Sequence, residues 1–180
     1  MKNLEIETVK KILEEFVKDT GEQLELILIG GLALQLYGLE DRATIDIDAE
    51  VEKGDLFKLF HFLKEKGIPA DLSENIAGWS VVSMPEGYRE RAKIVLQENN
   101  LVIKILDPYD FVIAKLRRGT QEDFKDALFV AKRFNLNPEK ILEYGELAIK
   151  NSIKDTALFN FKNRLDIFIK ELKEEKQSWN

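Results

Sequence analysis

The chain has 180 residues, with 27 Lys and Arg against 33 Asp and Glu, and a formal net charge of −6. It contains no cysteine and one histidine, which excludes disulfides, zinc–thiolate sites and thiol nucleophiles. The ordinary globular composition excludes a disordered or fibrous chain. No apolar run approaches the roughly 20 residues that span a bilayer, and the N-terminal residues are not typical of a secretory signal. We therefore expect a cytoplasmic protein that makes no membrane contact.

Charge is distributed unevenly along the chain. Residues 1–83 carry 9 basic and 17 acidic side chains, whereas residues 84–180 carry 18 and 16. The first half is thus the better candidate for binding a cation. No stretch is typical of a nucleic-acid-binding arm or of a basic patch with interleaved aromatic residues.

The first half alternates predicted helices and strands. Apolar residues at helical spacing predict a helix over 4–18, and the short apolar run 24–29 predicts a buried strand followed by a glycine turn. Strict alternation over 44–51 predicts a second strand whose acidic side chains share one face. The remaining elements predicted in this half are helices over 32–37 and 55–66 and strands over 79–84, 92–96 and 101–106, the last two joined by a turn at Asn99-Asn100.

After residue 106 the pattern predicts helices only. Four helix-start signals follow one another, each with a polar capping residue and either a proline directly after it or an acid three residues later. They are Asp107-Pro108, Thr120 with Asp123, Asn137-Pro138, and Ser152 with Asp155. We therefore expect an α/β (α+β) fold: a core over 1–106, with a mixed sheet flanked by helices, and a C-terminal helical bundle over 107–180 packed on that core.

One group of residues in the first half is a candidate binding site for a phosphate and a metal ion. The paired glycines Gly30 and Gly31 lie between a predicted strand and helix, where they allow close backbone approach and expose free N–H groups to an anion such as a phosphate. Asp46 and Asp48 lie two residues apart in a predicted strand, so their carboxylates project to one side and repel each other unless a cation neutralises them. Hard oxygen ligands of this kind suit Mg²⁺ or Mn²⁺.

Structural interpretations of the same residues stay open. The two glycines could form only a tight connection between strand and helix. The alternating acids could protect a solvent-facing strand edge from aggregation.

Taken in this order, the glycine turn, the short helix and the Asp-x-Asp strand resemble the nucleotidyltransferase superfamily. Within it, the chain is similar to the uncharacterised relatives of AbiEii-type toxins. The segments that carry this closer resemblance are Arg42-x-Thr44-x-Asp46-x-Asp48, Pro85-Glu86-Gly87-Tyr88 with Arg91, Asp107-Pro108-x-Asp110, Lys115-Leu116 and Asp123-x-x-Asp126.

The resemblance implies metal-dependent transfer of a nucleoside monophosphate from a nucleoside triphosphate to an acceptor hydroxyl. It assigns Asp46 and Asp48 to the Mg²⁺ or Mn²⁺ ion and to catalysis, and Gly30, Gly31, Arg42 and Thr44 to the nucleotide. It implies that Lys115 contacts a phosphate and that Asp123 or Asp126 orients Lys115 or helps to activate the acceptor. One departure is that the predicted strands 79–84, 92–96 and 101–106 lack the third carboxylate of classical members.

Several of these residues also allow structural interpretations. Asp123 could be the capping-box acid of Thr120, so Asp126 is the preferred candidate of the two. Lys115 could be a helix lysine that extends its ammonium group into solvent, and Arg42 could pair with Asp41 or with the strand acids. Arg117 and Arg118 are expected to be solvated.

The sequence thus favours a toxin-like nucleotidyltransferase whose acceptor is tRNA, another RNA or a protein side chain, with a cognate antitoxin as a further candidate partner. The alternative is a catalytically silent nucleotide-binding or interaction module, such as one half of a toxin–antitoxin pair. A purely structural or dimerising protein is a third hypothesis.

Overall fold

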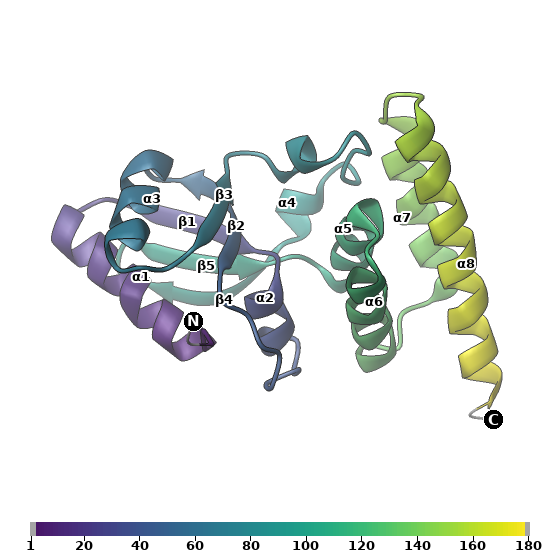
Figure 1. Ribbon diagram of the computed structural model, residues 1–180, viewed down its shortest axis with the longest axis horizontal. Coiled ribbons are helices and arrows are strands. Elements are labelled where there is room, and N and C mark those ends of the chain that lie inside the picture. The colour runs from purple at the N-terminus through teal and green to yellow at the C-terminus, as the bar shows by residue number, and fades with distance from the viewer. Residues whose placement is uncertain (1–2, 179–180) are drawn as a thin grey trace. The chain divides into compact units, whose positions relative to one another are not determined.

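The chain folds as two units (Figure 1). The computed structural model describes the backbone of residues 3–178 and the side chains of residues 3–175. Unit 1 comprises Met1–Ile76 and Ala92–Leu106, and unit 2 comprises Ala77–Arg91 and Asp107–Asn180. The domain boundary expected at residue 106 stays a prediction.

A five-stranded mixed sheet forms the centre of unit 1, in the order β3-β2-β1-β5-β4. Strand β1 pairs antiparallel with β2 and parallel with β5, β2 pairs parallel with β3, and β4 and β5 form an antiparallel hairpin. The predicted turn between β4 and β5 is present, with Asn99 at φ 49°. The strands are β1 (Leu24–Leu28), β2 (Ile47–Lys53), β3 (Ala70–Ser73), β4 (Lys93–Glu98) and β5 (Leu101–Ile105).

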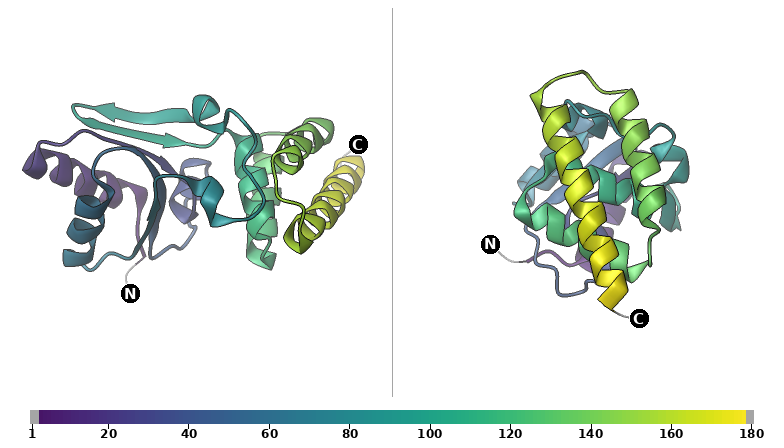
Figure 2. Two further views of the ribbon diagram at one scale, coloured as in Figure 1. Left: turned by 90° about the horizontal axis from the view of Figure 1, so that it is seen from above. Right: turned by 90° about the vertical axis from the view of Figure 1, so that its right-hand side faces the viewer.

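The two faces of this sheet differ in chemistry. Leu26, Val51 and Ile103 are neighbours on one face, which is apolar and buried. That face is covered by helices α1 (Ile6–Thr20) and α3 (Leu56–Glu65), whose Phe16 and Phe62 rings meet edge to face at 5.3 Å (Figure 2). Because side chains alternate along a strand, the charged residues of the same strands project from the opposite face.

The opposite face carries an ion-pair network across β1, β2 and β5. The Lys104 ammonium group contacts the Glu25 carboxylate and lies 2.9 Å from Oε2 of Glu52. Hydrogen bonding to Lys104 lowers the pKa of Glu25, although burial opposes this shift. The network satisfies charges that strand alternation places on a half-buried surface.

Unit 2 consists largely of helices that begin where the sequence predicts. The Asp107 side chain accepts from the Tyr109 N–H, the Asn137 side chain accepts from the Glu139 N–H, and Thr120 forms a complete capping box. For the last helix, Asp155 rather than Ser152 accepts from the first turn, at the Ala157 N–H. The helices are α4 (Tyr88–Arg91), α5 (Pro108–Arg118), α6 (Gln121–Arg133), α7 (Pro138–Lys150) and α8 (Thr156–Ser178).

The helices α5 to α8 form the predicted C-terminal bundle, in which α7 and α8 run side by side (Figure 2). Gly145 of α7 lies so close to Leu165 of α8 that a Cβ atom there would overlap the leucine side chain. The expected fold class, a mixed sheet flanked by helices and followed by helices, is therefore confirmed.

The strand predicted over 79–84 is wrong. The preceding residues form a 3-10 turn, Ile76–Trp79, and the segment after it is irregular. Its backbone groups are bound by side chains of unit 2 instead of a strand: the Arg117 guanidinium donates to the carbonyls of Val82 and Ala77, and Ser152 Oγ accepts from the Ser83 N–H. Side chains can satisfy buried backbone groups as well as a sheet does.

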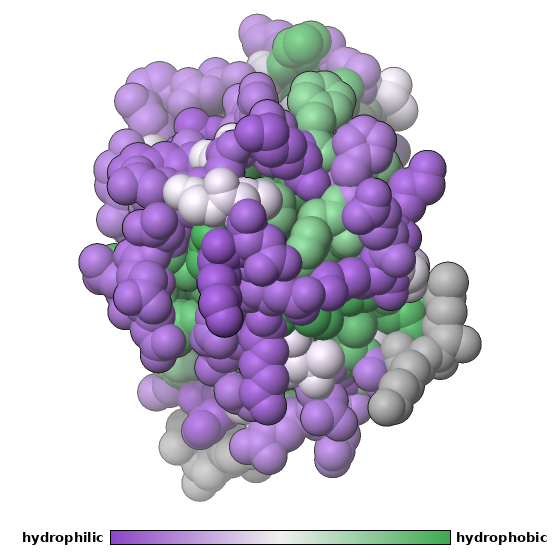
Figure 3. Space-filling model, turned by 90° about the vertical axis from the view of Figure 1, so that its left-hand side faces the viewer, coloured by the Kyte–Doolittle hydropathy of each residue, from purple (hydrophilic) through white to green (hydrophobic). Residues whose placement is uncertain are grey.

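Hydrophilic residues predominate on the face shown in Figure 3, with hydrophobic side chains visible between them. Among the described residues, no helix combines the length and the apolar character needed to cross a membrane.

Candidate functional site

The glycine turn predicted to bind phosphate lies against the Asp48 carboxylate. Gly30 precedes α2 (Gly31–Leu36), and the Ile29 N–H before it donates to the Asp48 carbonyl at 3.0 Å. A Cβ atom at Gly30 would overlap Oδ2 of Asp48 and lie 2.7 Å from its Cγ. Only glycine therefore leaves room for this carboxylate beside the turn.

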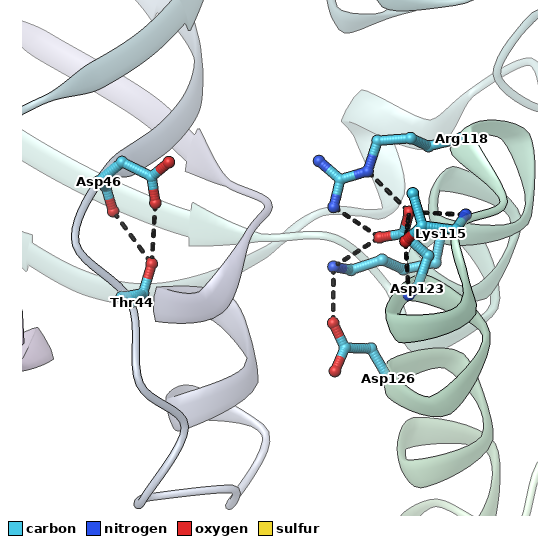
Figure 4. A network of polar contacts seen from close by, with 7 residues as sticks. Thr44, Asp46, Lys115, Arg118, Asp123 and Asp126 are labelled. Atoms are coloured by element: carbon cyan, nitrogen blue, oxygen red, sulfur yellow. Dashed lines mark hydrogen bonds and ion pairs between the residues drawn. The ribbon is translucent and has the colours of Figure 1, made fainter.

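The Thr44 side chain lies between Gly31 and Asp46 and contacts Asp46 (Figure 4). A Cβ atom at Gly31 would lie 2.6 Å from Cβ of Thr44. The Thr44 hydroxyl donates to Oδ1 of Asp46 at 2.9 Å. Asp48 thus touches the turn directly, whereas Asp46 reaches it through Thr44.

The backbone before these acids is anchored by Gln35 of α2, a residue that the sequence analysis did not single out. Its Nε2 donates to the carbonyls of Arg42 and Leu4, and its Oε1 accepts from the Ile6 N–H. The segment that contains Arg42 is thereby fixed to both α1 and α2. The Arg42 side chain is half-buried in this segment.

The extent of the acidic strand differs from the prediction. Strand β2 begins at Ile47, so Asp46 precedes it and strand alternation does not set the direction of its side chain. Glu50, which continues the alternation of Asp48, is fully buried, and its Oε2 accepts from the Ile76 N–H at 2.7 Å. This contact gives Glu50 a structural role.

A further acid on the neighbouring strand was missed by the sequence analysis. Asp71 of β3 lies in register with Asp48 of β2 in a parallel pair, so the two side chains project from the same face of the sheet. In the four-residue strand Ala70–Ser73, Ala70 and Leu72 alternate with polar residues, but a segment this short without a β-branched or aromatic residue is a weak strand signal. The register is the signal that reveals Asp71.

The donor chemistry of this region fits a single hard divalent cation. Among the described residues, no group of three or more acidic or imidazole side chains is arranged to hold a metal ion. Mg²⁺, however, is commonly bound by one or two carboxylates, and substrate phosphates and waters complete its coordination. Asp46 and Asp48 supply two carboxylates near the turn, the number that this smaller requirement needs, and the described residues form no all-protein cage.

In unit 2, the predicted lysine and both candidate aspartates lie together (Figure 4). The Lys115 Nζ is 2.9 Å from Oδ2 of Asp126 and 3.2 Å from Oδ1 of Asp123. All three side chains are buried, so the solvent-extended interpretation of Lys115 is wrong.

Asp123 has several other donors besides Lys115. Arg118 donates to both of its carboxylate oxygens, at 2.7 and 2.6 Å, and the N–H and hydroxyl of Thr120 donate to Oδ2. Burial would raise the pKa of Asp123, but the hydrogen bonds from Arg118 and Thr120 and the nearby cations outweigh it and lower that pKa to about 2. Asp123 is thus both the capping-box acid and an ion-pair partner, and it stays ionised near neutral pH.

The expected solvation of Arg117 and Arg118 holds only in part. The Arg118 side chain is 65% exposed but paired with Asp123. Arg117 is buried, and burial lowers its pKa to about 10. Its guanidinium holds the irregular segment after residue 76, which is a structural task.

The Pro85 to Arg91 motif also forms a partly buried ion pair within unit 2. Arg91 donates from Nε and Nη2 to the two oxygens of Asp110, both at 2.8 Å, and from Nη1 to the Glu86 carbonyl. Asp110 is fully buried, and burial raises its pKa against the effect of Arg91. A bidentate pair of this kind fixes the motif against α5.

The glycine turn and the acidic residues beside it led the sequence analysis to expect a nucleotidyltransferase, and a family match gives the same class. Residues 5–173 match the family described as "Nucleotidyltransferase of unknown function (DUF6036)". Because the match covers most of the chain, the protein belongs to this family. The roles assigned to individual site residues stay predictions.

The chain is similar to an antigenic nucleotidyltransferase-like protein from Paracoccidioides brasiliensis, with 16% sequence identity over 97% of this chain and 89% of that one and a TM-score of 0.47. No curated protein matches the chain.

Proposed function

We propose that this protein is a metal-dependent nucleotidyltransferase that moves a nucleoside monophosphate from a nucleoside triphosphate to a hydroxyl of an RNA or protein acceptor, in the manner of the AbiEii-type toxins. The bond between the α-phosphorus and the bridging oxygen to the β-phosphate breaks. A bond from the acceptor oxygen to the α-phosphorus forms, and pyrophosphate leaves. The proton of the acceptor hydroxyl passes to a base or to water.

The observation that carries this proposal is the contact between the Asp48 carboxylate and Gly30. A phosphate chain beside the turn needs both an uncovered backbone and a nearby cation site. The missing Cβ atom of Gly30 supplies the uncovered backbone and also the space that Asp48 occupies. Thr44 supports the arrangement because its hydroxyl holds Asp46 beside Gly31.

In this proposal Asp46 and Asp48 hold one Mg²⁺ or Mn²⁺ ion, together with oxygens of the triphosphate. The ion, when bound, neutralises phosphate charge and stabilises the charge that develops on the leaving group. The chain itself contributes alignment: Asp46 and Asp48 fix the position of the phosphates relative to the turn, while Gly30 and Gly31 allow them to approach the backbone.

We extend the proposal to the buried pair of unit 2. Lys115 contributes positive charge to the transfer reaction, and Asp126 orients it. Between the two aspartates, the contacts favour Asp126 for this role, because Asp123 already accepts hydrogen bonds from Arg118 and Thr120. The low pKa of Asp123 makes it a poor proton acceptor near neutral pH.

Label transfer tests the proposal directly. The purified chain is incubated with each α-³²P-labelled nucleoside triphosphate, Mg²⁺ or Mn²⁺, and either total RNA or cell lysate protein. We expect one triphosphate to label an acceptor, and we expect Asp46→Asn and Asp48→Asn to lower the rate roughly 100-fold or more. Asp19→Asn, at an exposed position of α1, is the matched control and should leave the rate unchanged.

The silent nucleotide-binding module is the second candidate, favoured by the absence of a cluster of three metal-ligating acids among the described residues. It predicts that triphosphate raises the melting temperature of the wild type while no acceptor becomes labelled. Equal label transfer by the wild type and both asparagine variants would contradict the placement of the site.

A further inference from the structure

A groove at the α7–α8 end of unit 2 combines an apolar floor with a basic rim. It has a volume of about 580 Å³ and lies where α7 ends and α8 begins. Ile149 and the buried Leu158 contribute apolar surface, and Phe159 beside them is 63% exposed. The cations of the rim are Lys150, Lys154 and Lys162.

The three lysines lie around one groove without a described carboxylate partner of their own. Among the side chains that the structure describes, none of the three forms an ion pair, whereas lysines such as Lys58 and Lys132 contact carboxylates. The lining holds these three cations and one carboxylate, Asp155, so its net charge is positive and attracts an anionic ligand.

The remaining polar groups of the groove are occupied by the fold. Ser152 Oγ donates to the Ala148 carbonyl and accepts from the Ser83 N–H. Asp155 accepts from the Ala157 N–H at the start of α8. The groove therefore presents a ligand chiefly with apolar surface and three ammonium groups.

We propose that this groove binds an acidic segment of a partner protein, one in which a large apolar side chain is flanked by Asp or Glu. An apolar centre within a charged rim is the usual anatomy of a protein interface. The aliphatic floor and the lack of arginine favour a protein over single-stranded nucleic acid, which is typically held by several aromatic or guanidinium planes. This proposal does not depend on the transfer reaction.

Chemical-shift mapping on the full ¹⁵N-labelled chain tests it. The probe is a synthetic 16-residue amphipathic peptide with Glu on one face and Leu and Phe on the other. We expect shifts confined to the amides of residues 149–162. Two control peptides, one with Lys in place of Glu and one with Ser in place of Leu and Phe, should bind at least ten times more weakly than the probe peptide.

Charge-reversal variants distinguish binding at the groove from attraction to the net charge of the whole protein. The triple variant Lys150→Glu, Lys154→Glu and Lys162→Glu should weaken peptide binding at least tenfold. The variant Lys11→Glu, Lys18→Glu and Lys64→Glu makes the same change in net charge at exposed positions of unit 1 and should bind normally. Phe159→Ser, at an exposed position, should weaken binding at least about fivefold.

Three results would overturn the proposal. Equal weakening by both triple variants would show that only net charge matters. Tighter binding of a 16-nucleotide single-stranded RNA to residues 149–162 would assign the groove to nucleic acid. A concentration-dependent dimer that covers these residues in sedimentation analysis would assign it to a second copy of the chain.

Discussion

The two acidic clusters of this protein differ in what compensates their charge. In unit 2, Asp123 and Asp126 receive hydrogen bonds from Lys115 and Arg118, and all but the arginine are buried. In unit 1, Asp46 is half-buried, and its described polar partner is the neutral hydroxyl of Thr44. Acidic charge that buried lysine and neighbouring arginine side chains compensate contributes to folding. A carboxylate held by a neutral hydroxyl, as Asp46 is held by Thr44, keeps its charge available to a cation.

The largest effect expected from this contrast is on stability, at Lys115. Lys115→Met removes the ammonium group but leaves the buried carboxylate of Asp126 in place. We expect the free energy of unfolding to fall by about 3 kcal/mol, because removing one partner of a buried ion pair is costly. Urea unfolding followed by circular dichroism measures the change. Asp46→Asn should change the same quantity little, and a similar loss in both variants would remove the contrast.

Gly30→Ala should affect activity more than folding. The added methyl group would overlap the Asp48 carboxylate and displace it from the turn. We expect the rate of nucleotide transfer to fall about 100-fold, since a displacement of about 1 Å at a reacting centre can cost that much.

Gly78→Ala is the matched control, because a Cβ atom there meets nothing within 4 Å. It should retain the wild-type rate. Full activity of Gly30→Ala would mean that Asp48 does not need its position beside the turn.

Acid should weaken unit 2 through Asp123. The pKa of this group is lowered from 3.8 to about 2 on folding, so its stabilising contribution is complete above about pH 4 and is lost as the pH falls toward 2. We expect the stability difference between the wild type and Asp123→Asn to shrink by about 2 kcal/mol over this range. Urea unfolding at pH 5, 4, 3 and 2 checks this, and a constant difference would contradict it.

The smallest effect is expected at Thr44. Thr44→Val removes the hydroxyl that donates to Asp46 but keeps a branched side chain against Gly31. We expect a loss of about 1 kcal/mol or less in stability and a several-fold slower transfer reaction. Thr44→Ser, which retains the hydroxyl, should restore most of the rate. A slow serine variant together with a fast valine variant would show that the hydroxyl is not the relevant group.

Local signals in the sequence predicted much of the fold. The helix starts at Asp107, Thr120 and Asn137 are determined by capping chemistry between residues close in the chain, and all three are present. The glycine turn was predicted because paired glycines between a strand and a helix are a local signal of close approach. The side chains that approach, those of Asp48 and Thr44, come from farther along the chain.

Features that depend on distant partners could not be predicted in this way. The apolar run over 79–84 has strand propensity, but Arg117, 35 residues beyond Val82, binds its carbonyls and leaves it irregular. Strand β3 has only four residues, none of them β-branched or aromatic, and it is stabilised by pairing with β2. For that reason Asp71 was overlooked.

The double use of Asp123 limits what a comparison of related chains could reveal. Its carboxylate both closes the first turn of α6 and binds Lys115, so a descendant that had lost all chemistry would still be under selection to keep it. Persistence of this aspartate among relatives would therefore report on folding. Asp126, in the interior of α6, is the position at which divergence would accompany the loss of activity.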